Sequence, residues 1–148
     1  MESEPIHIYV DTNVLINYCT NQKSDVDALN YVFKKRRKEV LFTSSLAVVQ
    51  TVANLQTKKA KRKAFTKDEV FSLLDKLLPK FTIVDLTVDD IAKSRHEVGN
   101  DVEDCVHAVL SKKKKCFAIL TNNISDFSSF KDICILPVSL GYLKTVVK

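Results

Sequence analysis

Residues 6–15 of the chain read IHIYVDTNVL. The first five of these residues are rich in apolar and β-branched side chains, which predicts a short buried strand over 6–10. Asp11 follows that strand directly, and the apolar residues from Val14 to Tyr18 indicate a short helix. In open parallel sheets, ligands bind at the carboxyl ends of the strands, so Asp11 marks the edge of the sheet at which chemistry is expected.

The rest of the chain alternates between expected strands and expected helices. Four more strands are predicted over residues 40–43, 81–84, 116–121 and 133–136. The helices between them are expected to begin at Ser24, at Ser44 or Ser45, at the capping box 66–69, at Thr87 or Asp89, at Asp101 and after Pro137. This alternation predicts an α/β fold, with a central, mainly parallel sheet of four to five strands and helices on both faces.

The apolar residues of the expected helices predict which faces are buried. Leu46, Val49 and Ala53 are expected to face the core from one helix, and Phe71 joins Val70 and the leucines of another. Val102 begins the expected apolar stripe of the helix that starts near Asp101. A length of 148 residues fits a single domain over 1–148.

Composition excludes several classes of protein. Apolar residues make up 45% of the chain, enough for a core, and the 2 glycines are too few to write a phosphate-binding loop. The 4 cysteines show no metal-ligand spacing and have apolar neighbours, so they are expected to be small core residues in a reducing compartment. No segment resembles a signal peptide or a membrane span, and the expectation is a cytoplasmic protein without membrane contact.

The formal net charge of +5 is concentrated in three basic runs, at 34–38, 58–63 and 112–115. A single run of this kind is as readily a solvated helix face as a binding surface. Three runs in one small chain favour a polyanionic partner, because such clusters attract phosphate backbones without reading sequence.

Three aspartates from distant parts of the chain are candidate metal ligands. Asp11 and Asp126 follow expected strands, while Asp104 shares a helix face with Asp101 and can hydrogen-bond His107. Each acid alone is more ordinarily a turn or a helix cap. Together at one sheet edge they would repel each other unless a cation such as Mg²⁺ or Mn²⁺ neutralised them. Such an ion can support phosphodiester hydrolysis, so the pattern indicates a nuclease.

Three sequence blocks resemble the PIN-domain family. They are IYVDTNVL at 8–15, DVEDCVHA at 101–108 and ILTNNISDF at 119–127. Their order and spacing are more specific than any one block. The resemblance implies a metal-dependent endoribonuclease in which Asp11, Asp104 and Asp126 bind Mg²⁺ or Mn²⁺ and Asp101 is an accessory acid.

The resemblance also implies further site residues and partners. Asn13, Gln50, Thr121 and Asn123 would shape the pocket. Many family members are toxins of bacterial toxin–antitoxin pairs and are often dimeric, so the implied partners are RNA, an antitoxin protein and a second copy of the chain. The family usually has Glu at the place of Gln50 and often Arg at the place of Asn122. The first departure implies a weaker second metal site.

Two other functions remain open from the sequence. A PIN-like domain with weakened catalysis could bind RNA or a protein partner, and Gln50 favours this alternative. A phosphoryl-transfer protein could use Asp11 as a phosphate acceptor, but Asn13 and Val14 follow Thr12 where the DxDxT pattern would require other residues.

Overall fold

A five-stranded, all-parallel sheet forms the centre of the molecule, in the order β3-β2-β1-β4-β5. The computed structural model describes residues 6–35 and 40–147. The strands are β1 (Ile8–Val10), β2 (Leu41–Ser44), β3 (Thr82–Val84), β4 (Ala118–Thr121) and β5 (Cys134–Pro137). The predicted parallel α/β fold with four to five strands is therefore confirmed.

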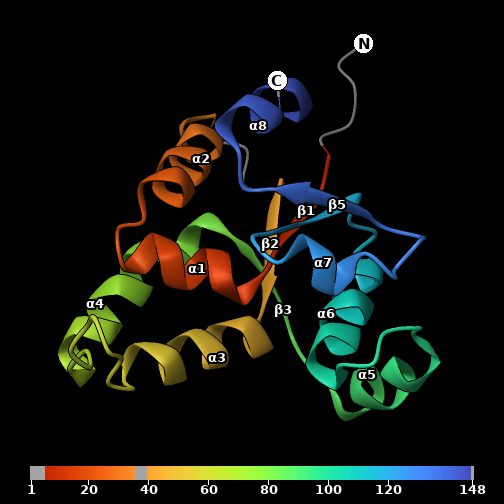
Figure 1. Cartoon of the computed structure of the whole chain (residues 1–148), viewed down its shortest axis with the longest axis horizontal. Coiled ribbons are helices and arrows are strands. Elements are labelled where there is room, and N and C mark those ends of the chain that lie inside the picture. Colours follow the sequence, from red (N-terminus) through yellow and green to blue (C-terminus); the bar gives the residue numbers. More distant parts are fainter. Residues whose placement is uncertain (1–5, 36–39, 148) are drawn as a thin grey trace.

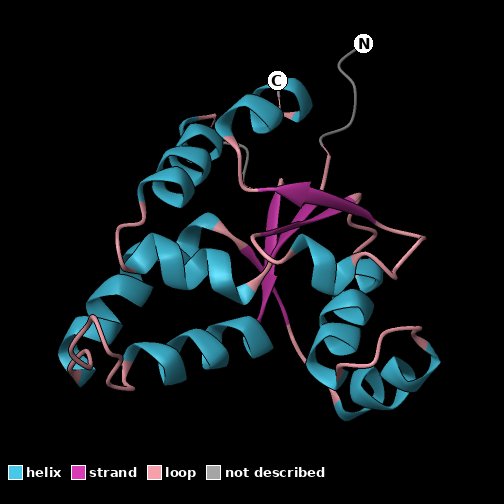
Figure 2. Ribbon diagram, in the orientation of Figure 1, coloured by secondary structure: helices cyan, strands magenta, loops and turns pink. Residues whose placement is uncertain are grey.

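Helices cover both faces of the sheet (Figures 1 and 2). They are α1 (Thr12–Cys19), α2 (Lys23–Lys34), α3 (Ser45–Leu55), α4 (Lys67–Leu77), α5 (Val88–Lys93), α6 (Val102–Lys113), α7 (Ile124–Phe127) and α8 (Leu140–Val146). Two 3₁₀ turns, Leu78–Lys80 and Ser94–His96, follow α4 and α5. In the described part of the chain, no helix is both long enough and apolar enough to cross a bilayer.

Alternate residues of the central strand β1 enter two separate cores. Ile8 and Val10 pack with residues of α1 to α4 and α8 on one face of the sheet. Tyr9 points to the other face and packs with residues of α6 and α7. Because successive strand side chains point to opposite faces, a three-residue strand buried on both sides needs no polar position.

Several predicted details of the helices are wrong. Ser24 does not cap α2, which begins one residue earlier after Gln22; the Ser24 hydroxyl donates to Asp25 instead. Val49 and Ala53 are exposed, because α3 buries Ala47, Thr51 and Leu55 and turns its other side toward a pocket.

The remaining differences concern single apolar side chains and one basic run. Phe71 is exposed because α4 buries only the stripe of Val70, Leu74 and Leu77, and Val102 is exposed at the first position of α6, whose buried face begins at Cys105. Cys19, Cys105 and Cys116 are buried as expected, whereas Cys134 on the edge strand β5 is exposed. The basic run at 34–38 reaches into residues 36–39, which lie outside the described residues.

The predicted caps of three helices are confirmed. Ser44 caps α3 by accepting a hydrogen bond from the backbone of Ala47. Thr66 opens α4 in a complete capping box with Glu69, and Thr87 opens α5 in the same way. The caps at Ser44 and Thr87 fix where the segments after β2 and β3 enter a helix, and the cap at Thr66 fixes where α4 begins after α3.

Candidate functional site

A pocket of about 480 Å³ opens at the carboxyl ends of the strands. The strand order turns at β1, since β2 and β4 lie on its two sides, and this switch point is where ligands bind in open α/β sheets. The residues that line the pocket are Asp11, Thr12, Asn13, Ile16, Gln50, Ala53, Asn54, Thr57, Lys59, Glu103, Asp104, His107 and Asn123.

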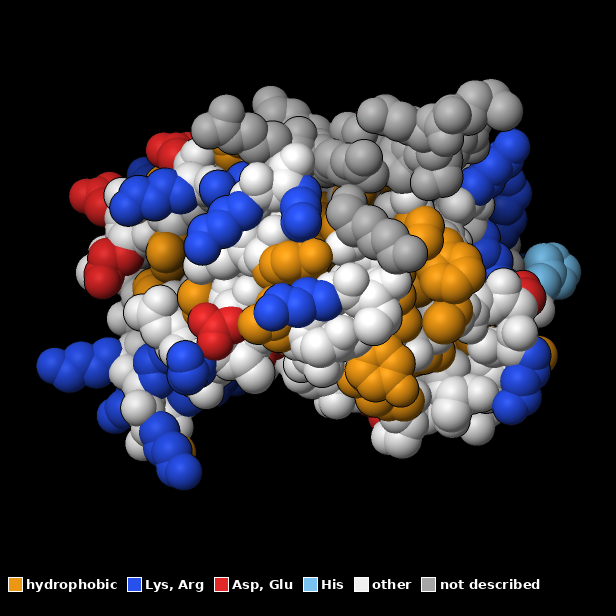
Figure 3. All heavy atoms as spheres, turned by 90° about the horizontal axis from the view of Figure 1, so that it is seen from above, with side chains coloured by type: hydrophobic (Ala, Val, Ile, Leu, Met, Phe, Trp, Pro, Cys, Tyr) orange, Lys and Arg blue, Asp and Glu red, His pale blue; other side chains and the backbone are white. Residues whose placement is uncertain are grey.

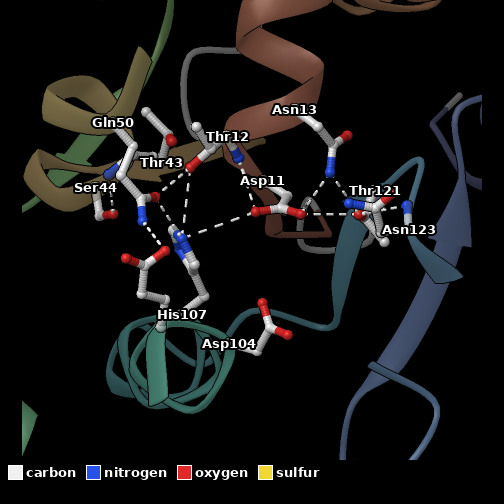
Figure 4. A network of polar contacts seen from close by, with 12 residues as sticks. Asp11, Thr12, Asn13, Thr43, Ser44, Gln50, Asp104, His107, Thr121 and Asn123 are labelled. Carbon is white, nitrogen blue, oxygen red and sulfur yellow. Dashed lines mark hydrogen bonds and ion pairs between the residues drawn. The ribbon is translucent and has the colours of Figure 1, made fainter. Parts of the chain in front are cut away.

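Asp11 lies at the centre of this edge, between β1 and α1 (Figure 4). Its Oδ1 accepts the backbone N–H of Thr12 at 2.8 Å and so caps α1. Its Oδ2 accepts from Asn13 Nδ2 at 2.7 Å and from Thr121 Oγ1 at 2.8 Å. The carboxylate is buried and rigidly oriented, and Oδ1 has lone-pair capacity left on the pocket side.

The amide and hydroxyl groups around Asp11 hold one another in place. Asn13 Oδ1 accepts from the backbone and the side chain of Asn122, which leaves its Nδ2 directed at Asp11. Thr121 accepts from the backbone of Asn123 while it donates to Asp11. The structure thus brings Asn13, Thr121 and Asn123 to the pocket edge.

Asp104 faces the same pocket from the first turn of α6, and it is partly buried. Burial, and then the charges of Asp101, Asp11, Asp126 and Glu103, raise the pKa of the Asp104 carboxyl to about 6. A cation nearby would stabilise the ionised form of a carboxyl group that is surrounded by so many negative charges.

Asp101 and Asp126 lie further out. The side chain of Asp101 accepts the backbone N–H of Asp104 at 3.0 Å and caps α6, which gives it a structural role. Asp126 is exposed on α7 and is near enough to influence Asp104, but it does not line the pocket. The expected participation of Asp126 stays a prediction.

Gln50 links three elements at the pocket (Figure 4). Its Nε2 donates to Glu103 Oε2 at 2.7 Å, while its Oε1 accepts from Thr12 Oγ1 at 2.6 Å and contacts His107 Nε2 at 2.9 Å. Because an ionised carboxylate only accepts hydrogen bonds, the end of the Gln50 amide that faces Glu103 must be the nitrogen. His107 Nε2 must then donate to the Gln50 oxygen.

This assignment continues into a buried chain of hydrogen bonds. Burial lowers the pKa of His107, so the ring is neutral and its Nδ1 accepts from Tyr9 Oη at 2.6 Å. Tyr9 Oη gives its single proton to His107, so it must accept from Ser44 Oγ, also at 2.6 Å, while Ser44 Oγ accepts from the backbone of Ala47. The sequence suggested a hydrogen bond between His107 and Asp104. His107 instead links the buried pair Ser44–Tyr9 to Gln50 at the pocket.

Three residues of this site carry no functional signal in the sequence. Glu103 lies within the block 101–108, and Tyr9 is an ordinary apolar position of the first strand. Asp25 is fully buried on α2 and accepts from Asn122 Nδ2 at 2.8 Å, so it supports the segment after β4. The sequence signal was an Asp in the first turn of a predicted helix, which does not distinguish Asp25 from an ordinary acidic residue at a helix start.

The oxygen donors at the pocket suit a hard divalent cation. Asp11, Glu103 and Asp104 offer carboxylate oxygens, whereas both ring nitrogens of His107 are already in hydrogen bonds. Among the described residues, no three His, Cys, Asp or Glu side chains are arranged to hold an ion by themselves. The donor set therefore fits an ion such as Mg²⁺, which keeps several waters and takes few protein ligands.

Replacing Asp104 with Asn is expected to stabilise the metal-free protein at pH 8. Since folding raises the pKa of this acid from 3.8 to about 6, its ionisation disfavours the folded state above pH 6 and has no effect below pH 4. Allowing for solvent screening, the gain is about 1 kcal/mol, or roughly 2–4 °C in Tm. Thermal unfolding with a chelator at pH 8 and pH 4 checks this, and an equal gain at both pH values would contradict it.

A family model described as the PIN domain matches residues 8–133. The chain therefore belongs to the PIN-domain family. No curated protein sequence is significantly similar to the chain.

Solved structures with the same fold include toxin–antitoxin proteins. The VapBC2 complex of Rickettsia felis, bound to a DNA fragment from its promoter, is 18% identical over 89% of this chain and 98% of that chain, with a TM-score of 0.65. DNA-bound VapBC of Salmonella typhimurium is 15% identical over 90% and 98%, with a TM-score of 0.66. VapC20 of Mycobacterium tuberculosis, described as a toxin that cleaves the sarcin–ricin loop, is 15% identical over 85% and 96%, with a TM-score of 0.59.

Proposed function

We propose that this protein is a metal-dependent endoribonuclease and the toxin of a toxin–antitoxin pair. The observation that carries the proposal is the pocket at the switch point of the sheet. Asp11 and Asp104 both line it among other oxygen donors, and the charge of Asp11 helps to raise the pKa of Asp104. Family membership and the toxin–antitoxin proteins that share the fold support it.

Each group of the pocket has a definite task in this proposal. Asp11, Asp104 and Asp126 would hold the ion, and the charge of Asp126 already acts on Asp104 from α7. Asn13 and Thr121 keep the carboxylate of Asp11 in one orientation. When bound, Mg²⁺ or Mn²⁺ supplies Lewis-acid chemistry that neutralises phosphate charge and activates water.

The basic run at 58–63 is placed to guide RNA into this pocket. Lys59 lines the pocket, and its backbone forms an antiparallel β-bridge with the backbone of Arg62 across a tight turn between α3 and α4. Arg62 is anchored by bonds to the carbonyl oxygens of Asn54 and Leu55, so the lysines of the turn stay exposed. Lys and Arg side chains project from the end of the molecule where α4 lies (left in Figures 1 and 3).

The run at 112–115 supports substrate binding less well. Lys112 forms ion pairs with Glu97 and Asp132, and Lys113 pairs with Asp90. Much of the positive charge of this run is therefore neutralised by acidic side chains of the protein itself. This run is better interpreted as a solvated helix end whose lysines form ion pairs within the protein.

A labelled circular RNA tests the activity directly, because a circle has no ends and only an endonuclease can open it. We expect linear products with millimolar Mn²⁺ or Mg²⁺ and none with a chelator. A matched circular DNA shows whether the protein distinguishes the two backbones. Persistent circles at every metal concentration would remove the enzyme proposal.

A second candidate function is an RNA- or protein-binding domain with lost catalysis. The observation that favours it is Gln50, whose amide oxygen and nitrogen are both engaged within the protein. Under this candidate, RNA would be retained in a filter-binding or mobility assay without any cleavage. A purified antitoxin that blocks RNA cleavage would instead support the toxin role.

A further inference from the structure

Glu103 occupies a special place among the acids of the pocket. It lines the same pocket as Asp11 and Asp104, and its Oε2 is fixed at 2.7 Å from Gln50 Nε2 across the gap between α6 and α3. Glu103 is otherwise an exposed residue of the first turn of α6, and among the described residues Gln50 is its only hydrogen-bond partner through the side chain.

The Gln50 side chain is itself held in one orientation. Thr12 and His107 both donate to its oxygen, and His107 is fixed in turn by Tyr9 from the far side. The amide nitrogen is therefore left to point at Glu103. A chain of hydrogen bonds thus runs from the buried Tyr9 through His107 and Gln50 to an exposed carboxylate, which would need no partner to be stable.

We propose that Glu103 acts on the metal ion of this site through bound water rather than as a direct ligand, and that Gln50 is its positioning residue. A Glu at position 50 would supply a negative charge from α3. In this chain Glu103 supplies that charge from α6. The inference rests on the proposed function, since it concerns the ion used by that same pocket.

The geometry explains why position 50 carries an amide. A Glu in place of Gln50 would direct a carboxylate oxygen at Glu103, where the amide now donates a hydrogen bond. Two carboxylates at that distance repel each other unless a proton or a cation lies between them. An amide at position 50 and an acid at position 103 form a complementary pair.

Metal binding measured without RNA tests the proposal. Titration of the protein with Mn²⁺, followed by calorimetry or by the paramagnetic resonance of free Mn²⁺, gives an affinity that does not depend on catalysis. Glu103→Gln is expected to lower this affinity by about 10- to 100-fold, the effect of losing an important group at a metal site. Asp75→Asn removes the same charge from an exposed position of α4 and should change the affinity less than about twofold.

Gln50→Met tests the positioning role. It keeps the length of the side chain but removes both hydrogen-bonding ends, so the Mn²⁺ affinity should fall in the otherwise wild-type protein. In a protein that already carries Glu103→Gln, the same change should add little, because the two residues act as a unit. Equal effects of Gln50→Met in both backgrounds would overturn the positioning role.

The exchange of the two residues provides a rescue. The double variant Gln50→Glu with Glu103→Gln restores one acid and one amide in contact, and its affinity should return to within a few-fold of the wild type. If the wild type binds Mn²⁺ and opens circular RNA while Glu103→Gln binds equally well, this inference fails and the proposed function stands. If the wild type binds no ion, the proposed function fails first.

Discussion

Asp11→Asn is expected to reduce RNA cleavage by about a hundredfold or more, the size of effect seen when one preorganised electrostatic group is removed from an active site. Asp11 contributes a buried carboxylate at the switch point of the sheet, and its two oxygens are already oriented by Thr12, Asn13 and Thr121. The substitution removes the charge and leaves the size of the side chain unchanged. Single-turnover cleavage at saturating Mn²⁺ measures the loss.

Stability must be followed in the same variant. An Asn at position 11 would place an N–H₂ group where Oδ2 now accepts from Asn13 and Thr121, so donors would face donors. We expect a loss of about 1–3 kcal/mol in the free energy of unfolding. Activity is therefore compared well below the Tm, with Asp75→Asn as the charge-matched control. Cleavage within threefold of the wild type would remove Asp11 from the active site.

Tyr9→Phe is expected to destabilise the protein by about 3 kcal/mol, because it leaves two buried polar groups without a partner. Ser44 Oγ–H would lose its acceptor, and His107 Nδ1 would lose its donor. Tyr9 is completely buried in the central strand, and burial raises the pKa of its phenol, so the hydroxyl group stays protonated and can donate. The Tm should fall by roughly 6–12 °C for a chain of this length.

Tyr142→Phe is the matched control for this change. It removes the same atom from an exposed ring of α8, and its effect on urea unfolding should stay within about 0.5 kcal/mol. Equal midpoints for the two variants would show that the network from Ser44 to His107 contributes nothing. A second readout is Mn²⁺ affinity, which should fall in Tyr9→Phe if the network orients Gln50.

The sheet could be predicted from sequence because its signals are local. Short runs of buried, β-branched residues alternate with capping residues, and the caps at Ser44, Thr66 and Thr87 are formed as expected. The buried faces of the helices were less predictable. Val49 and Phe71 are apolar but exposed, since which side of a helix is covered depends on neighbours distant in sequence.

The candidate site was only partly predictable for the same reason. Asp11 and Asn13 follow β1, Thr121 ends β4 and Asn123 follows it, so the rule for parallel sheets places all four at one edge. The contact between Gln50 and Glu103 joins residues 53 positions apart, and no local pattern announces it. His107 was expected to pair with its own helix neighbour, but its partners come from β1 and α3.

The contact of Asp11 with Thr121 spans 110 residues, and it has a consequence for the protein as it is made. The ribosome delivers β1 before β4, so β1 must wait for this neighbour until residues 118–121 have left the tunnel. Domains fold as they emerge, from the N-terminal end. A growing chain thus carries Asp11 110 residues before it carries Thr121, the residue that orients it. If the proposed function is right, the newly made chain has no ordered pocket, and so no nuclease activity, until β4 has emerged from the ribosome.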